Sequence, residues 1–253
     1  MHFIFRTHYA LLLLLAAILS LQPGLLAADD DDFAELRKAL AERLPDIKVT
    51  SINETPLEGI YELISSGQIY YLSGDGRFVI EGELIDLEAR KNLTTERLGS
   101  LHLALINDMD EAEMLVYKGE SDDPSKPNRS ITVFTDVSCG YCRKLHTELD
   151  TFIESGVDVR YLLFPRAGLG TPAAQALESV WCADDPQGAM TIAKSGGKVA
   201  EKTCENPIEN HMAVAEQIGL RGTPLIYLDN GVRIPGYRSA NELVDILNAS
   251  EPM

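Results

Sequence analysis

The sequence predicts a chain of mixed α+β and α/β class, with a small β-rich unit followed by a larger α/β domain. Short apolar runs separated by turn residues fill positions 60–87, and this pattern favours a small antiparallel meander. A polar, proline-containing segment follows at 120–128 and indicates a domain boundary. Beyond it, strand and helix patterns alternate from 131 to 247, as they do in α/β domains.

Composition and charge narrow the classes of partner. The 253 residues are 45% hydrophobic and 24% charged, as in an ordinary folded protein. The formal net charge is −17, so the chain has no basic surface with which to neutralise phosphates. Nucleic acid is therefore excluded as a partner.

The N-terminus has the order of a secretory signal peptide. Arg6 precedes the apolar run Leu11–Leu21, Pro23-Gly24 breaks it, and the small pair Ala27-Ala28 follows. The alternative is an uncleaved anchor, but the run is shorter than the roughly 20 residues that span a bilayer. We therefore expect residues 1–28 to be a cleaved signal peptide. In the oxidising compartment beyond the membrane, the four cysteines are expected to form two pairs, 139–142 and 182–204.

Residues 29–93 are predicted to form the N-terminal domain. Phe33, Leu36, Leu40 and Leu44 recur at helical spacing within Asp32–Leu44. The meander that follows is punctuated by glycine-containing turns. We expect strands at Ile60–Ile64, Ile69–Leu72, Phe78–Ile80 and Leu84–Leu87. A unit of this size has a thin core and gains stability from a partner.

Residues 94–127 are predicted to be a linker helix and loop. Thr94 or Thr95 is expected to cap a helix that runs toward Met114, with leucines on one face. The loop Glu120–Asn128 ends this region.

Residues 128–253 are predicted to form the C-terminal domain, in the order strand, Cys-x-x-Cys, helix, strand, helices, hairpin, helix. This order is the layout of a thioredoxin-like domain. Ser239 and Glu242 form a capping-box pattern before the last helix, and Asn230-Gly231 suits a type I′ hairpin turn. The expected elements are strands Ile131–Phe134 and Val157–Leu163, a helix at Arg143–Ile153, helices within Thr171–Met212, and a hairpin of Leu225–Leu228 with Val232–Ile234.

The segment Cys139-Gly140-Tyr141-Cys142 lies at a strand-to-helix junction. A thiolate at a helix N-terminus is stabilised by unpaired amides and the helix dipole, and the thiolate is the nucleophile in disulfide exchange. We therefore expect Cys139 to attack disulfides. Cys142, one turn further along, would resolve the mixed disulfide.

Two other uses of the cysteines stay open. Cys139, Cys142 and His146 have a spacing that would suit zinc ligands. Structural zinc sites usually use a second closely spaced pair of ligands as well. Redox chemistry is therefore favoured, and no metal is expected. We expect His146 to be exposed or partly packed. Cys182 and Cys204 are expected to form a structural disulfide; a second redox pair or two unrelated thiols are the alternatives.

Thr223-Pro224, preceded by Gly222, is the second part of the predicted site. A thioredoxin-like domain carries a cis-proline at this position, opposite the Cys-x-x-Cys, where the backbone of the preceding residue can pair with a substrate strand. Thioredoxin also has a buried Asp six residues before its first cysteine. Val133 holds that position here, so an Asp-assisted proton relay is not expected.

The chain resembles the DsbC/DsbG family of disulfide isomerases. The resemblance lies in Ile131–His146, Phe164–Leu169, Val180–Ala183, Gly222–Pro224 and Pro235–Tyr237, with Met114–Lys118 resembling the end of the family's linker. It is strong over 114–247 and weaker over 29–113, and the Gly-Tyr pair between the cysteines favours the DsbC branch.

The resemblance implies a periplasmic, V-shaped homodimer. Each chain would have a small cystatin-like dimerisation domain, a linker helix and a thioredoxin-like domain with a helical insertion. The partners implied are misfolded exported proteins with wrong disulfides and a membrane thiol reductase that keeps the site reduced. No cofactor is implied. Tyr141, Thr223 and Pro224 are expected to bind substrate.

Three functions remain in competition: a dimeric isomerase with possible chaperone activity, a monomeric oxidase or reductase, and a chaperone-like binding protein in which the thiols are secondary. The separate N-terminal domain favours the isomerase, because a simple oxidase has no evident use for it.

Overall fold

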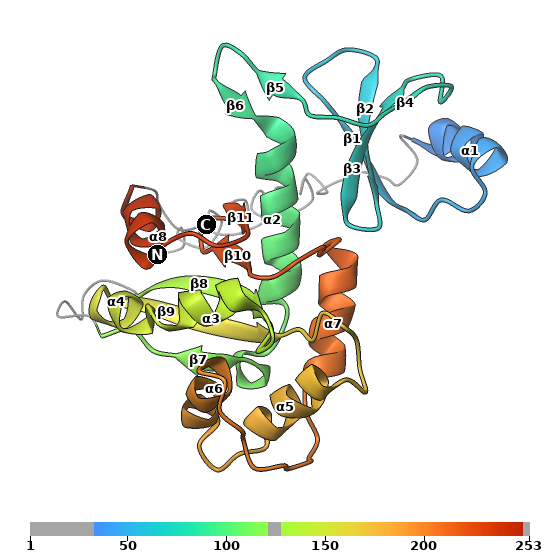
Figure 1. Cartoon of the computed structure of the whole chain (residues 1–253). Coiled ribbons are helices and arrows are strands. Elements are labelled where there is room, and N and C mark those ends of the chain that lie inside the picture. The colour runs from blue at the N-terminus through green and yellow to red at the C-terminus, as the bar shows by residue number, and fades with distance from the viewer. Residues whose placement is uncertain (1–32, 121–127, 250–253) are drawn as a thin grey trace, which may run out of the picture.

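The computed structural model describes residues 33–120 and 128–249. The expected signal peptide (1–28) and most of the expected loop at 120–128 lie outside the described residues. Two folded units are present, and the long helix α2 (Leu93–Asn107) runs between them (Figure 1). In the part of the chain that is described, no helix is both long and apolar enough to cross a bilayer.

The N-terminal unit is an antiparallel sheet of order β1-β2-β3-β4 with helix α1 packed against it. Its elements are α1 (Ala34–Arg43), β1 (Val49–Glu54), β2 (Ile60–Ser65), β3 (Gln68–Ser73) and β4 (Val79–Ile80). The core lies where Leu36 and Leu40 of α1 meet Leu63 and Leu72 of the sheet. Strand β1 is absent from the sequence prediction because Ile52 is its only buried residue.

The turn between β2 and β3 has left-handed backbone at both central residues. Ser66 has φ +48° and Gly67 has φ +69°. A two-residue turn with two positive φ angles is type I′, which matches the twist of the strands that it joins.

Helix α2 begins and ends earlier than the sequence predicts. Its cap is Asn92, whose side chain accepts a hydrogen bond from the Thr95 amide, and not Thr94 or Thr95. Thr94 is instead buried, and its hydroxyl contacts that of Tyr71. After Asn107 the chain forms the 3₁₀ helix η1 (Glu111–Glu113).

Strand β7 (Leu115–Tyr117) follows and joins the C-terminal sheet, although its residues lie in the range predicted as linker. Leu115 and Tyr117 are buried in the C-terminal core. This burial explains why the segment is part of the C-terminal unit and not of the linker.

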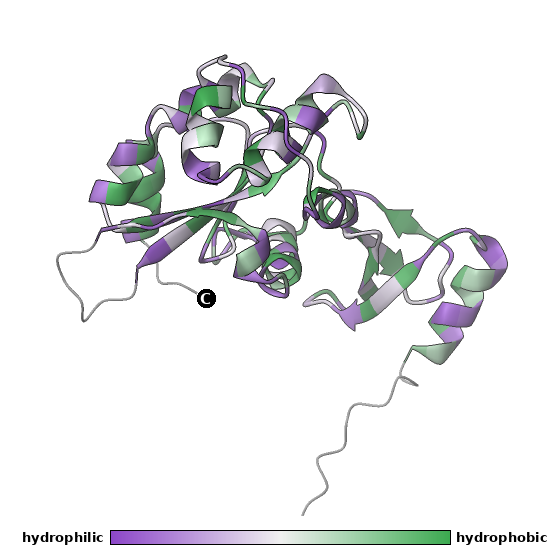
Figure 2. Cartoon of the chain, turned by 90° about the horizontal axis from the view of Figure 1, so that it is seen from below, coloured by the Kyte–Doolittle hydropathy of each residue, from purple (hydrophilic) through white to green (hydrophobic). Residues whose placement is uncertain are grey.

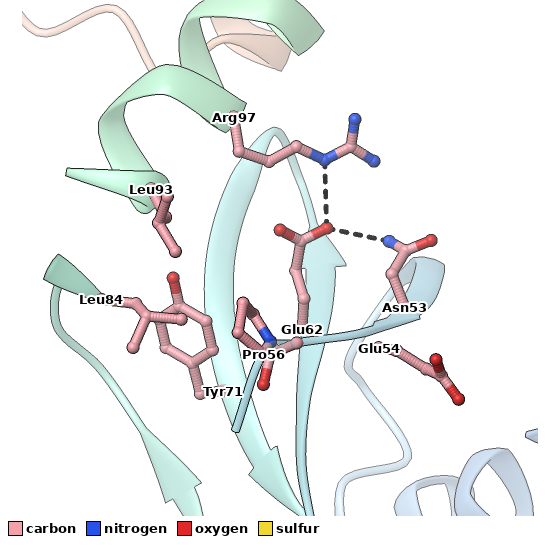
Figure 3. Close-up of a pocket in the computed structure, with 9 residues that line it drawn as sticks. Asn53, Glu54, Pro56, Glu62, Tyr71, Leu84, Leu93 and Arg97 are labelled. Carbon is pink, nitrogen blue, oxygen red and sulfur yellow. Dashed lines mark hydrogen bonds and ion pairs between the residues drawn. The ribbon is translucent and has the colours of Figure 1, made fainter. Parts of the chain in front are cut away.

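Polar contacts fix the start of α2 to the N-terminal sheet (Figure 3). Arg97 Nε donates to Glu62 Oε1 at 3.2 Å, and Asn53 Nδ2 donates to the same oxygen at 2.9 Å. A small two-stranded sheet, β5 (Ile85–Asp86) with β6 (Lys91–Asn92), leads into the helix.

The C-terminal unit is a five-stranded sheet of order β11-β10-β8-β9-β7. The central pair β8 (Arg129–Thr135) and β9 (Val157–Leu163) is parallel, and every other pair in this sheet is antiparallel. β10 (Leu225–Leu228) and β11 (Arg233–Pro235) form the hairpin at one edge. The predicted mixed α+β and α/β fold class is confirmed.

Helices cover this sheet. Each of these helices carries both hydrophobic and hydrophilic residues (Figure 2). They are α3 (Gly140–His146), α4 (Leu149–Glu154), α5 (Pro172–Trp181), α6 (Pro186–Lys194), α7 (Ile208–Gln217) and α8 (Ala240–Asn248). The single helix predicted at Arg143–Ile153 is wrong, because the chain breaks at Thr147 and Glu148. The Glu148 carboxylate there accepts a hydrogen bond from the Ala240 amide at the start of α8.

Of two local predictions in this domain, one is correct and one is wrong. The capping box of Ser239 and Glu242 is confirmed. The hairpin turn is not type I′, because Gly231 has φ +80° while Asn230 is not among the described residues with positive φ. The Gly231 amide donates to Leu228 O at 3.0 Å, closing a four-residue turn.

The two units interlock through α2 and the β2–β3 turn. A Cβ on Gly99 would lie 2.1 Å from Gly231 O, and one on Gly67 would lie 1.5 Å from Gln217 O, so both contacts require glycine. Between them, His102 bonds to Gly67 O through Nε2 and to the Tyr227 hydroxyl through Nδ1, each at 2.8 Å.

Candidate active site

The loop between β8 and α3 places Cys139 at the N-cap of the helix. Asp136, fully buried at the end of β8, holds this loop. Its carboxylate accepts hydrogen bonds from the Ser138 amide (2.7 Å) and hydroxyl (2.8 Å) and from the Arg166 amide and Nε (3.0 Å each). The loop is therefore fixed before any substrate arrives.

Cys139 has the character of a nucleophile. Burial alone would raise the pKa of this thiol, but hydrogen bonds from the Cys142 amide and the Thr223 hydroxyl, together with the charge of Arg166, outweigh that effect and lower its pKa. A lowered pKa increases the fraction present as thiolate, which is the attacking species.

Cys142 lies deeper, with 1% of its surface exposed. Burial is the main reason that its pKa is raised. The two thiols therefore differ as an attacking and a resolving sulfur should: the outer one ionises more easily than the inner one. The structure holds both as free cysteines.

The Thr223-Pro224 peptide bond is cis and lies opposite the thiols. The Cys139 thiol donates to Thr223 O at 3.2 Å. The Thr223 hydroxyl is buried beside the two sulfurs, and its interaction with them lowers the pKa of both cysteines.

An aromatic pair flanks the cysteines. Tyr141 is 63% exposed, and its ring stacks on that of Tyr237 with centroids 6.0 Å apart. Lys144 Nζ lies 4.3 Å from the centroid of the Tyr237 ring. This pair offers an exposed apolar surface next to the nucleophile.

The other two cysteines are joined. Cys182 at the end of α5 and Cys204 form a disulfide with Cα atoms 5.8 Å apart. They are therefore not available as zinc ligands, and no group of three or more His, Cys, Asp or Glu suited to a metal occurs within the described ranges.

His146 is buried, and the expectation of an exposed or partly packed residue is wrong. Its ring bonds to the hydroxyls of Tyr161 and Thr191, each at 3.1 Å. Burial lowers the pKa of His146 to about 4, so the ring is neutral. Residues from β9 and α6 enclose the ring, and the spacing of α3 alone does not reveal them.

Sequence reasoning did not identify three charged residues of the site: Asp136, Arg166 and Lys194. Asp136 and Arg166 lie within segments that carry the family resemblance, and this resemblance could have identified them as site residues. Lys194 lies in the helical insertion and is 4% exposed. A lone lysine on an amphipathic helix gives no sequence signal of burial.

A buried thiol pair, a cis-proline beside it and a five-stranded α/β sheet define the class of the protein: it is a thiol–disulfide oxidoreductase of thioredoxin-like fold. Residues 123–251 match the model of the thioredoxin-like domain family, and residues 27–95 match that of the disulfide bond isomerase protein N-terminal domain.

Similar proteins narrow the class to a family. The thiol:disulfide interchange protein DsbC of Salmonella typhimurium is 36% identical over 245 residues, 96% of each chain. DsbC of Escherichia coli K12 is 34% identical over 95% of this chain and 96% of its own. A disulfide interchange protein of known structure from Neisseria gonorrhoeae has a TM-score of 0.48 and 26% identity, covering 56% of this chain and 97% of that one. The chain belongs to the DsbC family of disulfide isomerases and is an enzyme of thiol–disulfide exchange.

Proposed function

We propose that this chain is a periplasmic homodimer that rearranges incorrect disulfides in exported proteins, with Cys139 as the nucleophile and Cys142 as the resolving thiol. The observation that carries the proposal is the position of Cys139, which is the N-cap of α3 and donates from its thiol to Thr223 O at 3.2 Å. Cys139 can then attack a substrate disulfide next to the place where the substrate backbone would dock.

The chemistry needs no net electron transfer. The Cys139 thiolate attacks one sulfur of a wrong disulfide, forming a mixed disulfide and releasing the other sulfur as a thiolate. That thiolate attacks a second disulfide of the substrate and frees another substrate thiolate. This last thiolate attacks the substrate sulfur of the mixed disulfide and expels the Cys139 thiolate, so one set of disulfides is exchanged for another. When rearrangement fails, Cys142 attacks Cys139 and releases a reduced substrate, leaving the pair oxidised. A membrane thiol reductase is then needed to return the pair to dithiol.

Substrate docking is proposed for Tyr141, Thr223 and Pro224. The backbone of Thr223 lies within hydrogen-bond distance of Cys139, and the exposed Tyr141 ring supplies apolar contact. Cys182 and Cys204 are proposed as structural, since their bridge ties the end of α5 to the segment that follows α6.

Dimerisation is proposed through the edge strand β4. Within the described residues, β4 pairs with β3 on one side only, and its two residues are exposed: Val79 at 45% and Ile80 at 50%. Phe78 is 58% exposed just before them. An apolar edge strand is a template for pairing with a second copy. The N-terminal domain (29–93) would pair, and the C-terminal domain (128–253) would carry the chemistry.

The test is Val79→Lys in the full-length protein, because a lysine on an edge strand blocks pairing. We expect a monomer by light scattering that still reduces a small disulfide but loses isomerisation of a scrambled multi-disulfide substrate. Leu57→Lys is the matched control, since Leu57 is 50% exposed in the same unit but lies outside β4.

A dimeric Val79→Lys protein would contradict the proposed interface, and a monomer with full isomerase activity would contradict the need for a dimer. Exchange activity that survives Cys139→Ser would contradict the assignment of the nucleophile. If the protein suppresses aggregation equally well with both Cys139 and Cys142 replaced by Ser, it also acts as a chaperone.

A further inference from the structure

A lysine is buried beside the thiol pair. Lys194 is the last residue of α6, and its Nζ donates to the Thr135 hydroxyl and, at 3.1 Å, to Asp136 O. Both acceptors lie at the end of β8, immediately before the loop that carries Cys139. The ammonium therefore lies behind the active site, away from solvent.

Lys194 forms no ion pair with a carboxylate in the described parts of the chain. The carboxylate that acts on this ammonium, that of Asp136, already accepts hydrogen bonds from Ser138 and pairs with Arg166 at 3.0 Å. An ammonium that is buried without a counter-ion is destabilised because it loses its hydration without a compensating charge. Burial accordingly lowers the pKa of Lys194 to about 8.

Several titratable groups face this ammonium, from the β8–α3 loop, from α3 and from β9. They are Asp136, Cys139, Cys142, Arg143, His146 and Tyr161.

Most of these groups cannot supply the missing negative charge. Arg143 is a cation, and His146 is neutral because burial lowers its pKa to about 4. Burial raises the pKa of Tyr161 well above its ordinary value, so the phenol keeps its proton. Cys139 has its own stabilising partners in the Cys142 amide and Arg166.

Cys142 remains, and it meets the same residue as the ammonium. Lys194 Nζ donates to Asp136 O at 3.1 Å, the backbone of Asp136 also bonds to Cys142, and both side chains are buried where α3 packs against α6. After burial, which raises its pKa, the charge of Lys194 is the strongest influence on this thiol, and it acts to lower the pKa.

We propose that Lys194 is a positioning residue for the resolving step, and that its buried ammonium is the counter-ion of the Cys142 thiolate. The inference rests on the proposed roles of Cys139 and Cys142. In the mixed disulfide, Cys142 must first release its proton to solvent, and the resulting thiolate then attacks the sulfur of Cys139. The new bond joins Cys142 to Cys139, the bond between Cys139 and the substrate breaks, and the substrate sulfur leaves with the electron pair.

The pairing exists only while Cys142 is a thiolate, that is, during the resolving step. Cys142 is a neutral thiol in the resting dithiol, because burial raises its pKa, and it carries no charge once it is in a disulfide. Lys194 thus supplies a charge of opposite sign to the buried Asp of thioredoxin, whose position is Val133 here.

The test begins with Cys139→Ala, which leaves Cys142 as the free thiol to be titrated by its ultraviolet thiolate absorbance. Adding Lys194→Met should raise the pKa of Cys142 by a unit or more, and Lys194→Arg should restore it. In the enzyme with both cysteines, Lys194→Met should slow release of substrate from the mixed disulfide about tenfold at pH 7, since one pKa unit is tenfold in thiolate. Lys202→Met is the control, because Lys202 pairs with exposed Asp184 in the same unit.

An unchanged Cys142 pKa in the Lys194→Met protein overturns the proposal. If that variant does not fold, the reciprocal measurement decides. The pKa of Lys194, followed by NMR of its side chain, should be lower in Cys139→Ala/Cys142→Ala than in Cys139→Ala, because coupling between two sites is mutual. Equal Lys194 pKa values in the two proteins overturn the proposal. Neither titration depends on isomerase activity, so this test and that of the proposed function fail independently.

Discussion

Removing the Cys182–Cys204 bridge should destabilise the C-terminal unit without disabling its chemistry. The bridge closes a loop with a sequence separation of 22. Restricting an unfolded loop of that length stabilises the folded state by about 3 kcal/mol in the chain-entropy model. Cys204 is exposed and Cys182 is half-buried, so replacing both with Ser leaves no large cavity. The loss should therefore be close to the entropic term, roughly 100-fold in the unfolding equilibrium.

The single tryptophan gives a local probe for this measurement. Trp181 immediately precedes Cys182 and packs against the core of the C-terminal unit, so its fluorescence in urea reports on the unfolding of that unit. Cys182→Ser alone should cost as much as the double variant, because either change opens the loop.

Two results would refute this reasoning. A loss well below 1 kcal/mol would mean that the bridge does not restrict the unfolded chain as argued. A double variant of normal stability that has lost exchange activity would mean that the bridge is a second redox pair and not a structural one.

Three further outcomes follow from the site and the interlock. Arg166→Met should raise the pKa of Cys139, seen as slower alkylation at mildly acidic pH, because a nearby positive charge is lost; Arg166→Lys should keep most of the effect, and equal rates in all three proteins would refute it. Stability in urea should fall as pH drops from about 6.5 towards 4, because burial lowers the pKa of folded His146 to about 4 while the unfolded chain binds that proton near 6.5; His146→Gln should flatten this slope, and an unaltered slope would count against a neutral buried ring. Gly67→Ala should loosen the contact with the backbone of α7, since its Cβ would meet an oxygen at 1.5 Å; hydrogen exchange in α2 should rise, more than in Gly59→Ala, which has a similar φ and open space around it.

The sequence was sufficient for the parts of the structure that local patterns encode. The capping box at Ser239, the hydrophobic face of α1 and the strands around the thiol pair all follow from residue type and spacing. The type I′ turn expected at Asn230-Gly231 failed because a longer turn with one left-handed glycine also joins these strands. The type I′ geometry occurs instead at Ser66-Gly67, between β2 and β3.

The site itself was only partly predictable, for a physical reason. The Cys139-x-x-Cys142 segment and Thr223-Pro224 are local motifs whose chemistry can be inferred from their types. The electrostatic environment of the thiols comes from Asp136, Arg166 and Lys194, which reach them from separate elements. Burial of Lys194 depends on how α6 packs over the end of β8, and this is a tertiary property that no sequence window contains.

The glycine contacts around α2 also have a mechanical consequence. Since Gly99 meets Gly231 and Gly67 meets Gln217 at backbone distance, neither unit can turn about the helix without breaking close-packed contacts and both bonds of His102. In the proposed dimer each chain would then behave as a stiff arm, and the paired β4 edge would be the pivot. The gap between the two Cys139 sulfurs would vary only as far as that pivot bends. The width of that gap, and not the flexibility of a linker, would set the largest folded substrate able to reach both sites.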